Sequence, residues 1–422
     1  MPDEKGSSIV VIGGGISGIT TAIEAAEAGH SSVIVERNPY LGGRVAQLNR
    51  YFPKLCPPYC GLEINFKRIK QNPKVSVYTL AEVESVAGSE GNFNVKIKKN
   101  PRFVNEKCTA CGECVKVCPV ERSNSFNFGI DKTKAVYLPH ELSYPMRFAI
   151  DQSPGVCPGK SCAKCVPACK YNAIDLDMKA ETVELKASSV VYATGWNPYD
   201  ATKMDNLGFG KVKNVITNMM MERLAAPNGP TKGKILRPSD NKQVKTVAFV
   251  QCAGSRDENH LAHCSSVCCM ASLKQATYFR EGDPETKAFM YYIDLRAPGK
   301  YEDFLKKMQA DANVMMIKGK VAKIEEDAGT LDPIVTVEDI VGGKKITQRV
   351  DMVVLATGME PSLKVANAGT NVKLDENGFV DADAQAAGIY ASGVAKRPND
   401  VTTSLQDATN VALKGIQSAV RR

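Results

Sequence analysis

The first 36 residues contain the pattern that most constrains the fold of this chain. An apolar stretch (8–12) leads into a glycine-rich turn, and a second apolar stretch (32–36) follows an alanine-rich segment. The order predicts a βαβ unit, and its first turn reads Gly13-Gly14-Gly15-Ile16-Ser17-Gly18. Gly13 permits a tight turn, Gly15 permits close approach of a pyrophosphate, and Gly18 permits the helix to pack on the strand. We therefore expect a dinucleotide site; a glycine-rich turn without a ligand is the alternative.

Two further features favour a dinucleotide. The free N–H groups at the start of the helix would bind phosphates, with Ile16 and Ser17 in its first turn. Glu36 ends the second apolar stretch, where a carboxylate can hold the ribose hydroxyls.

Later segments favour FAD over NAD because they resemble two-dinucleotide-domain flavoproteins. The stretch after the second strand is similar to their E-R-x-x-x-x-G-G-R sequence, and two later strands end in A-T-G. Residues 388–394 resemble the last strand of the FAD domain in that family. This chain has Val394 where the family usually has an aspartate that contacts the ribityl chain of the flavin, so another residue should make that contact. A helix from about residue 401 would direct its N-terminus at the flavin ring. The resemblance implies flavin contacts from Arg37, Gly43, Arg44, Ala193, Thr194, Gly195, Gly358, Gly393, Thr402 and Thr403.

Fourteen cysteines stand in four groups, and no secretory signal precedes them. Disulfides are disfavoured in the cytoplasm, so clustered cysteines indicate metal or redox chemistry there. No apolar run is long enough to cross a bilayer. The net charge of +8 is spread along the chain, which does not favour nucleic-acid binding. We expect a cytoplasmic chain without a membrane span of its own.

Two cysteine runs predict a ferredoxin-type insertion. The first has the spacing C-x2-C-x2-C-x3-C-P, whose fourth cysteine normally ligates the other cluster. The crossed pattern would place one [4Fe–4S] cluster on Cys108, Cys111, Cys114 and Cys169, and the other on Cys118, Cys157, Cys162 and Cys165. Two tetrahedral zinc sites are the alternative. The second run opens with a longer spacing and lacks the closing proline.

A second dinucleotide fold is predicted from an apolar strand at 245–251, but the turn after it contains cysteines in place of the second G-x-G-x-x-G. We therefore expect no NAD(P) site. Cys264 and Cys268 are expected on one helical face above Cys252, so these residues and Cys269 predict a third [4Fe–4S] cluster. Buried free thiols are the alternative, as is a strained redox pair at Cys268 and Cys269.

The remaining cysteines, Cys56 and Cys60, follow the predicted flavin loop. These two thiols could either pack as neutral side chains or form a redox pair facing the flavin, and the sequence favours neither role. His260 and His263 flank Cys264 and are expected to be solvent-exposed loop residues.

Together these motifs resemble the A subunits of heterodisulfide reductases. The segments that carry the resemblance are the glycine fingerprint, the loop Tyr51-Phe-Pro-x-x-Cys56, the double ferredoxin run, and the segments 251–257 and 264–270. In length and layout the chain is similar to the A subunits of quinone-interacting membrane-bound oxidoreductases of sulfate reducers.

The resemblance implies a flavin and iron–sulfur electron-transfer subunit. Its expected partners are adenylylsulfate reductase, a second flavoprotein of the same type and a haem b membrane subunit, with electrons exchanged with menaquinone at the inner face of the cytoplasmic membrane. Alternatives are a soluble heterodisulfide reductase-type subunit, including one that splits electron pairs, a pyridine-nucleotide disulfide oxidoreductase, and a structural subunit with an inactive flavin.

The expected fold is α/β, a two-dinucleotide-domain FAD flavoprotein like thioredoxin and glutathione reductases, with an inserted α+β double [4Fe–4S] ferredoxin domain. The expected parts are FAD domain (1–100), ferredoxin insert (101–180), FAD domain return and linker (181–243), second dinucleotide-like domain (244–350) and the C-terminal part of the FAD domain (351–422).

Overall fold

The computed structural model describes residues 8–365 and 372–420 and divides into two compact units. Unit 1 comprises Met1–Trp196, Pro361–Arg397 and Val401–Arg422, and unit 2 comprises Asn197–Glu360 and Pro398–Asp400. Among the described helices, none is long and apolar enough to cross a membrane.

Unit 1 is built on a seven-stranded sheet of order β3-β2-β1-β10-β5-β4, with β20 also paired to β10. The strands β1, β2, β3 and β20 join the parallel part of the sheet, and β4 and β5 the antiparallel part. The first two strands and the helix between them confirm the predicted βαβ unit. The strand bounds are β1 (Ser8–Ile12), β2 (Ser32–Glu36), β3 (Val75–Thr79), β4 (Ala81–Ser89), β5 (Asn92–Lys99), β10 (Glu181–Tyr192) and β20 (Ile389–Ala391).

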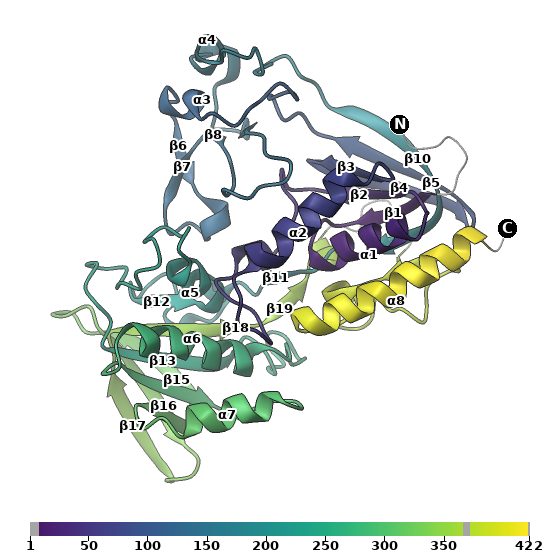
Figure 1. The fold of residues 1–422 in the computed structure, drawn as a ribbon. Coiled ribbons are helices and arrows are strands. Elements are labelled where there is room, and N and C mark those ends of the chain that lie inside the picture. The colour runs from purple at the N-terminus through teal and green to yellow at the C-terminus, as the bar shows by residue number, and fades with distance from the viewer. Residues whose placement is uncertain (1–7, 366–371, 421–422) are drawn as a thin grey trace. The chain divides into compact units, whose positions relative to one another are not determined.

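Alternating side chains of this sheet supply two separate cores. Ile9 packs with Ile19 of α1 (Ile16–Glu27) and Val411 of α8 (Val401–Val420). Val10 faces the opposite side and packs with Val95. Figure 1 shows α8 lying beside α1, with α2 (Pro58–Gln71) next to them. Successive side chains of a strand point to opposite faces of the sheet, so a strand of apolar residues contributes to the core on each face.

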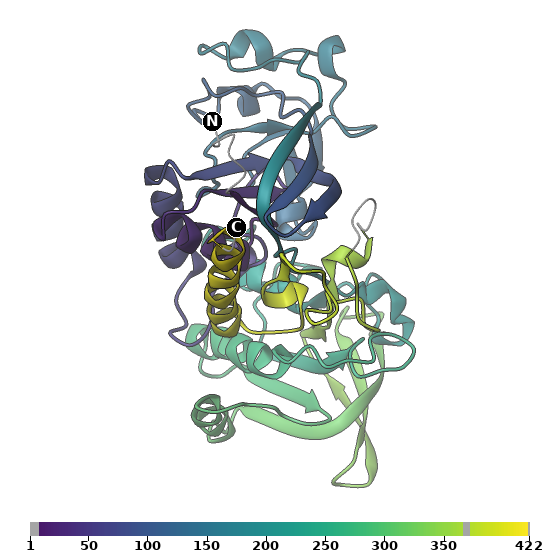
Figure 2. The ribbon, with the colours of Figure 1, turned by 90° about the vertical axis from the view of Figure 1, so that its right-hand side faces the viewer.

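The ferredoxin insert leaves and re-enters the sheet through one antiparallel pair, in which Lys99 of β5 faces Glu181 of β10. Figure 2 shows the long strand β10 running from the insert into the body of unit 1. The insert contains little regular structure, and its core mixes apolar residues with cysteines. Its elements are α3 (Glu113–Lys116), β6 (Glu121–Ser123), β7 (Lys132–Lys134), β8 (Val136–Tyr137), β9 (Ala149–Ile150) and α4 (Cys165–Ala168).

Unit 2 holds a second seven-stranded sheet of order β12-β18-β13-β14-β15-β16-β17, with its first five strands parallel. A separate two-stranded ladder joins β11 (Trp196–Pro198) to β19 (Met359–Pro361). The strand bounds are β12 (Val215–Thr217), β13 (Thr246–Ala253), β14 (Lys287–Tyr292), β15 (Val314–Glu326), β16 (Pro333–Asp339), β17 (Lys344–Arg349) and β18 (Met352–Thr357).

The boundaries of unit 2 differ from those expected from the sequence. The second A-T-G strand, β18, was expected in the FAD domain, but it pairs between β12 and β13 in the second sheet. Unit 2 therefore begins at Asn197 and its main segment ends at Glu360. Both A-T-G strands are apolar and end in the same three residues, so the sequence does not show which sheet each one joins. Only their pairing in the structure assigns them to different units.

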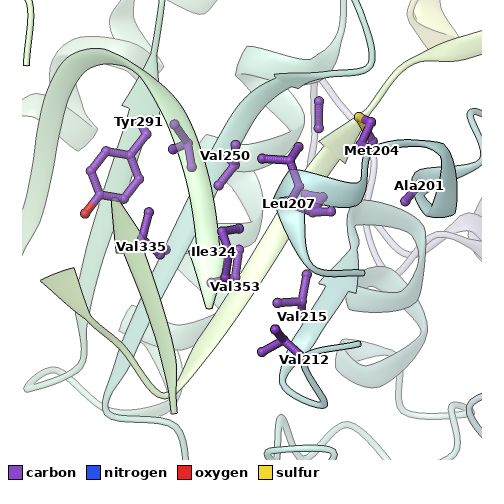
Figure 3. Packing of buried hydrophobic residues seen from close by; sticks show 14 of the residues in the cluster. Ala201, Met204, Leu207, Val212, Val215, Val250, Tyr291, Ile324, Val335 and Val353 are labelled. Carbon is purple, nitrogen blue, oxygen red and sulfur yellow. The ribbon is translucent and has the colours of Figure 1, made fainter. Parts of the chain in front are cut away.

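The two faces of the second sheet are covered differently. Figure 3 shows Val250, Val353 and Ile324 packed with Leu207 and Met204, which precede the sheet in sequence. The opposite face carries α5 (Asn218–Ala225), α6 (Cys268–Gly282) and α7 (Tyr301–Gln309), with the ring of Phe249 against a phenylalanine of α6.

The buried Arg237 links two strands of unit 2 through carboxylates. Its side chain is 7% exposed and lies 2.6 Å from Asp332 and 3.3 Å from Asp351. Replacement by methionine leaves these acids without their cation, and we expect unit 2 to lose about 3 kcal/mol of stability. Faster hydrogen exchange in β18 would measure the loss. The exposed Arg68–Glu27 pair is the control, and Arg68→Met should cost less than about 1 kcal/mol; equal effects would contradict the prediction.

Candidate flavin and iron–sulfur sites

The turn after β1 permits glycine alone at two of its positions. Gly13 has a φ of +112°, and a Cβ there would lie 2.3 Å from the carbonyl oxygen of Ala193. A Cβ on Gly18 would lie 1.9 Å from the carbonyl oxygen of Gly13. At Gly15 the nearest atom to a Cβ, outside its chain neighbours, is the Cα of Gly43 at 4.0 Å. The turn is thus tightly packed at Gly13 and Gly18 and has open space beside Gly15, where a pyrophosphate would approach the backbone.

A second glycine loop runs alongside this turn. Gly42 pairs with Gly15 in a parallel bridge, and its N–H donates to the carbonyl oxygen of Gly14 at 2.8 Å. A Cβ on Gly43 would lie 2.8 Å from the Cα of Gly15. The helix α1 begins at Ile16, and Ser17 lies buried in its first turn. The predicted phosphate-binding residues of the two loops are therefore adjacent.

Glu36 is buried at the end of β2, next to the glycine turn. One carboxylate oxygen accepts from the N–H of Gly14 at 2.6 Å, and the other accepts from the backbone and side-chain N–H groups of Asn38, each at 2.7 Å. Burial raises the pKa of Glu36, and these hydrogen bonds oppose the rise. The carboxylate is held in a fixed position beside the turn.

Two buried hydroxyls at the ends of neighbouring strands have no partner among the described residues. They belong to Thr194, which follows β10, and to Ser392, which follows β20. Gly393 lies nearby, and a Cβ there would meet the Ser17 hydroxyl oxygen at 2.1 Å. Gly195 has open space at the position of a Cβ. Unpaired buried hydroxyls at this edge fit a polar ligand such as FAD.

Asp407 organises the position where Val394 replaces the usual aspartate. This residue of α8 accepts a hydrogen bond from the N–H of Gly393 at 2.8 Å and pairs with Lys396. Sequence reasoning missed Asp407 because it is remote from the strand motif. Thr402 and Thr403 lie in the first turn of α8, and their direction toward the flavin stays a prediction.

The other predicted flavin residues lie in different surroundings. Arg37 is exposed, whereas Arg44 donates to the carbonyl oxygen of Trp196 and to Gln47, and burial lowers the pKa of Arg44. Gly358 does not lie in unit 1. It belongs to unit 2, where a Cβ would meet the Ser255 hydroxyl at 2.3 Å, so its assignment to the FAD domain does not hold.

Cysteines from both ferredoxin runs lie in one core, and the crossed ligand assignment stays a prediction. Burial raises the pKa of Cys114 to about 12, and the nearby thiols of Cys108, Cys111 and Cys165 raise it further. Burial also raises the pKa of Cys165, and there the neighbouring thiols are Cys157, Cys118 and Cys162. Cys118 thus lies with the second run although it belongs to the first. Cys169 packs in the same core.

A cavity marks the second of these sets. Its lining includes Cys118, Cys157, Cys162 and Cys165, and the cavity is partly open to solvent. Apolar side chains such as Val136 and Leu176 form other parts of the wall. Thiols around an apolar cavity suit a cluster held by soft anionic ligands.

Zinc is the alternative to iron–sulfur clusters at these cysteines. Within residues 8–365 and 372–420, no three His, Cys, Asp or Glu side chains lie close enough together to hold one metal ion. A structural zinc ion would need four such ligands around a single centre. The preference for iron–sulfur clusters over zinc therefore continues to rest on the ferredoxin-type spacing of the cysteines.

A third set of cysteines lies in unit 2. Cys252 is in β13, and Cys268 and Cys269 open α6. Burial raises the pKa of Cys268, and Cys252, Cys269 and Cys264 raise it further. Cys264 was expected on the same helical face as Cys268, but α6 begins only at Cys268, so Cys264 approaches from the preceding loop. The four thiols are neighbours, as the third-cluster prediction requires.

Polar groups surround this third set. Arg256 forms an ion pair with Asp294 at 2.9 Å, and its charge lowers the otherwise raised pKa of Cys252. The thiol of Cys269 donates to the carbonyl oxygen of Asp294 at 3.5 Å. Sequence reasoning included Arg256 in the motif but assigned it no role.

The histidines near this set are held by hydrogen bonds. The ring of His260 hydrogen-bonds the hydroxyl of Tyr199 at 2.9 Å, and that of His263 the carbonyl oxygen of Met359 at 3.0 Å. Both histidines are partly buried, so the expectation of solvent exposure was wrong. These two partners lie outside the cysteine set, which fits a structural role for the rings.

Cys56 and Cys60 lie at the loop before α2 and in its first turn. Cys56 is partly buried and Cys60 is exposed, and both thiols raise the pKa of Tyr51, which burial raises most. Both thiols are therefore close to one phenol, and the choice between packing and redox roles stays open.

We expect Gly18→Val to abolish FAD binding. The added side chain would overlap the Gly13 carbonyl and separate α1 from β1. The flavin absorbance of purified protein measures the loss. Gly282→Ala is the control, since a Cβ there meets nothing within 4 Å. Full flavin content in Gly18→Val would contradict the assignment.

The crossed ligand assignment predicts which variants share a defect. Cys118→Ser and Cys165→Ser should remove the same cluster signal in EPR spectra, and Cys114→Ser should remove the other one. Each should lower iron by about four atoms per chain. Cys60→Ser should leave both signals. The crossed pattern would be overturned if Cys118→Ser and Cys114→Ser lost the same EPR signal and Cys165→Ser lost the other one.

Comparison with known proteins identifies two segments. Residues 8–55 match the family model of FAD dependent oxidoreductases, and residues 101–121 match the 4Fe-4S binding domain. Two thioredoxin reductases, from T. acidophilum and Lactococcus lactis, superimpose with a TM-score of 0.54 at 14% identity, covering 98% and 99% of this chain and 99% and 100% of theirs. The predicted fold class is thereby confirmed.

Two relatives match over nearly the whole chain. The iron–sulfur A subunit of the CoB–CoM heterodisulfide reductase of Methanocaldococcus jannaschii is 37% identical over 434 residues, covering 99% of this chain and 64% of the relative. The A subunit of the H2:CoB-CoM heterodisulfide, ferredoxin reductase of Methanothermobacter marburgensis is 36% identical over 418 residues, covering 96% and 63%. The chain thus spans less than two thirds of these relatives. Over nearly its whole length the chain is similar to the A subunits of heterodisulfide reductases, and it contains segments that match FAD dependent oxidoreductases and the 4Fe-4S binding domain.

Proposed function

We propose that this chain transfers electrons between FAD, its iron–sulfur clusters and other redox proteins, and not from NAD(P)H. The observation that carries the proposal is the cysteine set at the strand-to-helix turn of unit 2, where a pyridine-nucleotide site would need a glycine-rich phosphate turn. The ring of Tyr199 also lies 2.5 Å from the position of a Cβ on Gly254, so it fills the space beside that turn. Four thiols gathered there suit a third cluster.

In this proposal the chain has a flavin site, two ferredoxin-type cluster sites and a third cluster site in unit 2. When bound, FAD supplies two-electron exchange and the clusters supply one-electron transfer. The glycine turns bring backbone N–H groups to the pyrophosphate, and Glu36 orients the ribose. The buried thiols, such as Cys114, Cys165 and Cys268, limit the access of water to the clusters. The proposed ligand sets are Cys108, Cys111, Cys114 and Cys169; Cys118, Cys157, Cys162 and Cys165; and Cys252, Cys264, Cys268 and Cys269.

For the physiological partners we propose a membrane-associated complex of sulfate respiration. In it, a second flavoprotein of this type and a haem b membrane subunit would link the chain to menaquinone and to adenylylsulfate reductase. The proposal rests on the sequence resemblance, and it would place the chain at the inner face of the cytoplasmic membrane through its partners.

A second candidate is a heterodisulfide reductase-type complex without a membrane subunit, including one that splits electron pairs. The names of the matched relatives favour it, since one of them is described as a ferredoxin reductase as well as a heterodisulfide reductase. Affinity purification of the tagged chain from its native cells separates the candidates. A haem b subunit in the purified complex, with oxidation of a menaquinol analogue, supports the first; soluble partners alone support the second.

The third cluster predicts a specific iron content. Anaerobically prepared protein should hold about twelve irons and one FAD per chain, and Cys264→Ser should lower iron to about eight with FAD unchanged. Cys60→Ser should leave iron unchanged. A content of about eight in the unmodified protein would rule out the third cluster, and rapid bleaching of the flavin by NADPH or NADH would contradict the exclusion of nucleotides.

A further inference from the structure

Arg102 is a buried cation whose hydrogen-bond partners are all neutral. Its residue is 5% exposed. Its guanidinium donates to the carbonyl oxygens of Arg147 (3.0 Å), Phe148 (3.4 Å) and Pro39 (2.5 Å), and to the hydroxyl of Thr79 (2.8 Å). These bonds engage both terminal nitrogens of the guanidinium but leave its charge without an ion-pair partner among the described residues.

Such an arrangement is unfavourable by itself. A buried charge without a counter-ion costs several kcal/mol, whereas Arg237 of unit 2, equally buried, faces Asp332 and Asp351. Burial lowers the pKa of Arg102 to about 10, so the group stays protonated at neutral pH. Among the charged groups that act on it, Arg147 repels it, while the phenol of Tyr137 and the thiol of Cys108 attract it when ionised.

The backbone near Arg102 is connected to both Cys108 and Cys169, the first and last cysteines of one proposed ligand set. Cys108 lies six residues further along the chain. The intervening segment pairs with the segment just after Cys169, since Val104 bridges Ile174 and the N–H of Asn105 donates to the carbonyl oxygen of Ala173 at 2.7 Å. The backbone that follows Arg102 is therefore fixed between the two ends of the set formed by Cys108, Cys111, Cys114 and Cys169, and the Arg102 guanidinium is close enough to the Cys108 thiol to interact with its charge.

We propose that Arg102 is the counter-charge of the cluster held by this set, and that it raises the reduction potential of that cluster. The inference rests on the proposed cluster assignment. On reduction the cluster accepts one electron and becomes more negative, and a fixed cation in a low-dielectric interior stabilises the reduced form more than the oxidised form. Arg102 acts as a positioning residue through charge, without touching iron.

The alternative is that Arg102 only anchors the insert, because two of its four partners, Pro39 and Thr79, belong to the scaffold. A substitution at Thr79 separates the two roles. Thr79→Asp places a carboxylate against the guanidinium and neutralises its charge while the arginine stays in place, and Thr79→Asn is the matched neutral control.

The test is an EPR-monitored redox titration of the full chain with its clusters. In Arg102→Gln and in Thr79→Asp, we expect the reduction constant of one cluster to fall about tenfold, a shift of about 59 mV to lower potential. Arg102→Lys and Thr79→Asn should retain most of the unmodified potential. Arg280→Gln is a further control, since Arg280 already faces Asp311 at 2.8 Å in unit 2.

The outcomes are distinct. Unchanged potentials in both Arg102→Gln and Thr79→Asp, with iron content intact, would overturn the inference and leave the proposed function standing. If Arg102→Gln fails to fold, the comparison of Thr79→Asp with Thr79→Asn decides alone, and equal potentials there overturn the inference. Absence of iron and sulfide from the unmodified protein would overturn the cluster assignment itself.

Discussion

The pairing of β10 is the interaction on which the rest of unit 1 depends. Its first half pairs antiparallel with β5, and its second half pairs parallel with β1 and β20. The first pairing closes the base of the ferredoxin insert. The second places Ala193 and Thr194 against Gly13, so one strand connects the cysteine-bearing insert to the dinucleotide turn.

Burial of thiols is the second constraint, and it connects folding to metal binding. Burial raises the pKa values of Cys114, Cys165 and Cys268, so these side chains favour the neutral thiol in the protein alone. Iron ligation requires thiolate, and assembly of clusters therefore has to release protons. The cost of burying anionic ligands gives a reason for the protein to fix a cation such as Arg102 beside them.

Local patterns predicted most of the individual elements. The βαβ unit, the strands on either side of the insert and the start of α8 all lie where apolar periodicity and glycine spacing placed them. Cys118 lies beside Cys165 of the second run, as the ferredoxin spacing led us to expect, while the full crossed ligand assignment stays a prediction. Gly358, Cys264 and the histidines did not match, since each depends on contacts between segments distant in sequence.

The sequence by itself determined three local motifs through the short spacings between their residues: a glycine-rich dinucleotide turn, a ferredoxin run and a cysteine-rich turn after the strand at 245–251. The tertiary structure alone decided which strand joined which sheet, and hence that β18 and Gly358 lie in unit 2. It also decided that Asp407 bonds Gly393 and that Arg102 is buried among neutral acceptors. Spacing constrains neighbours along the chain, whereas burial and charge pairing depend on residues that only folding brings together.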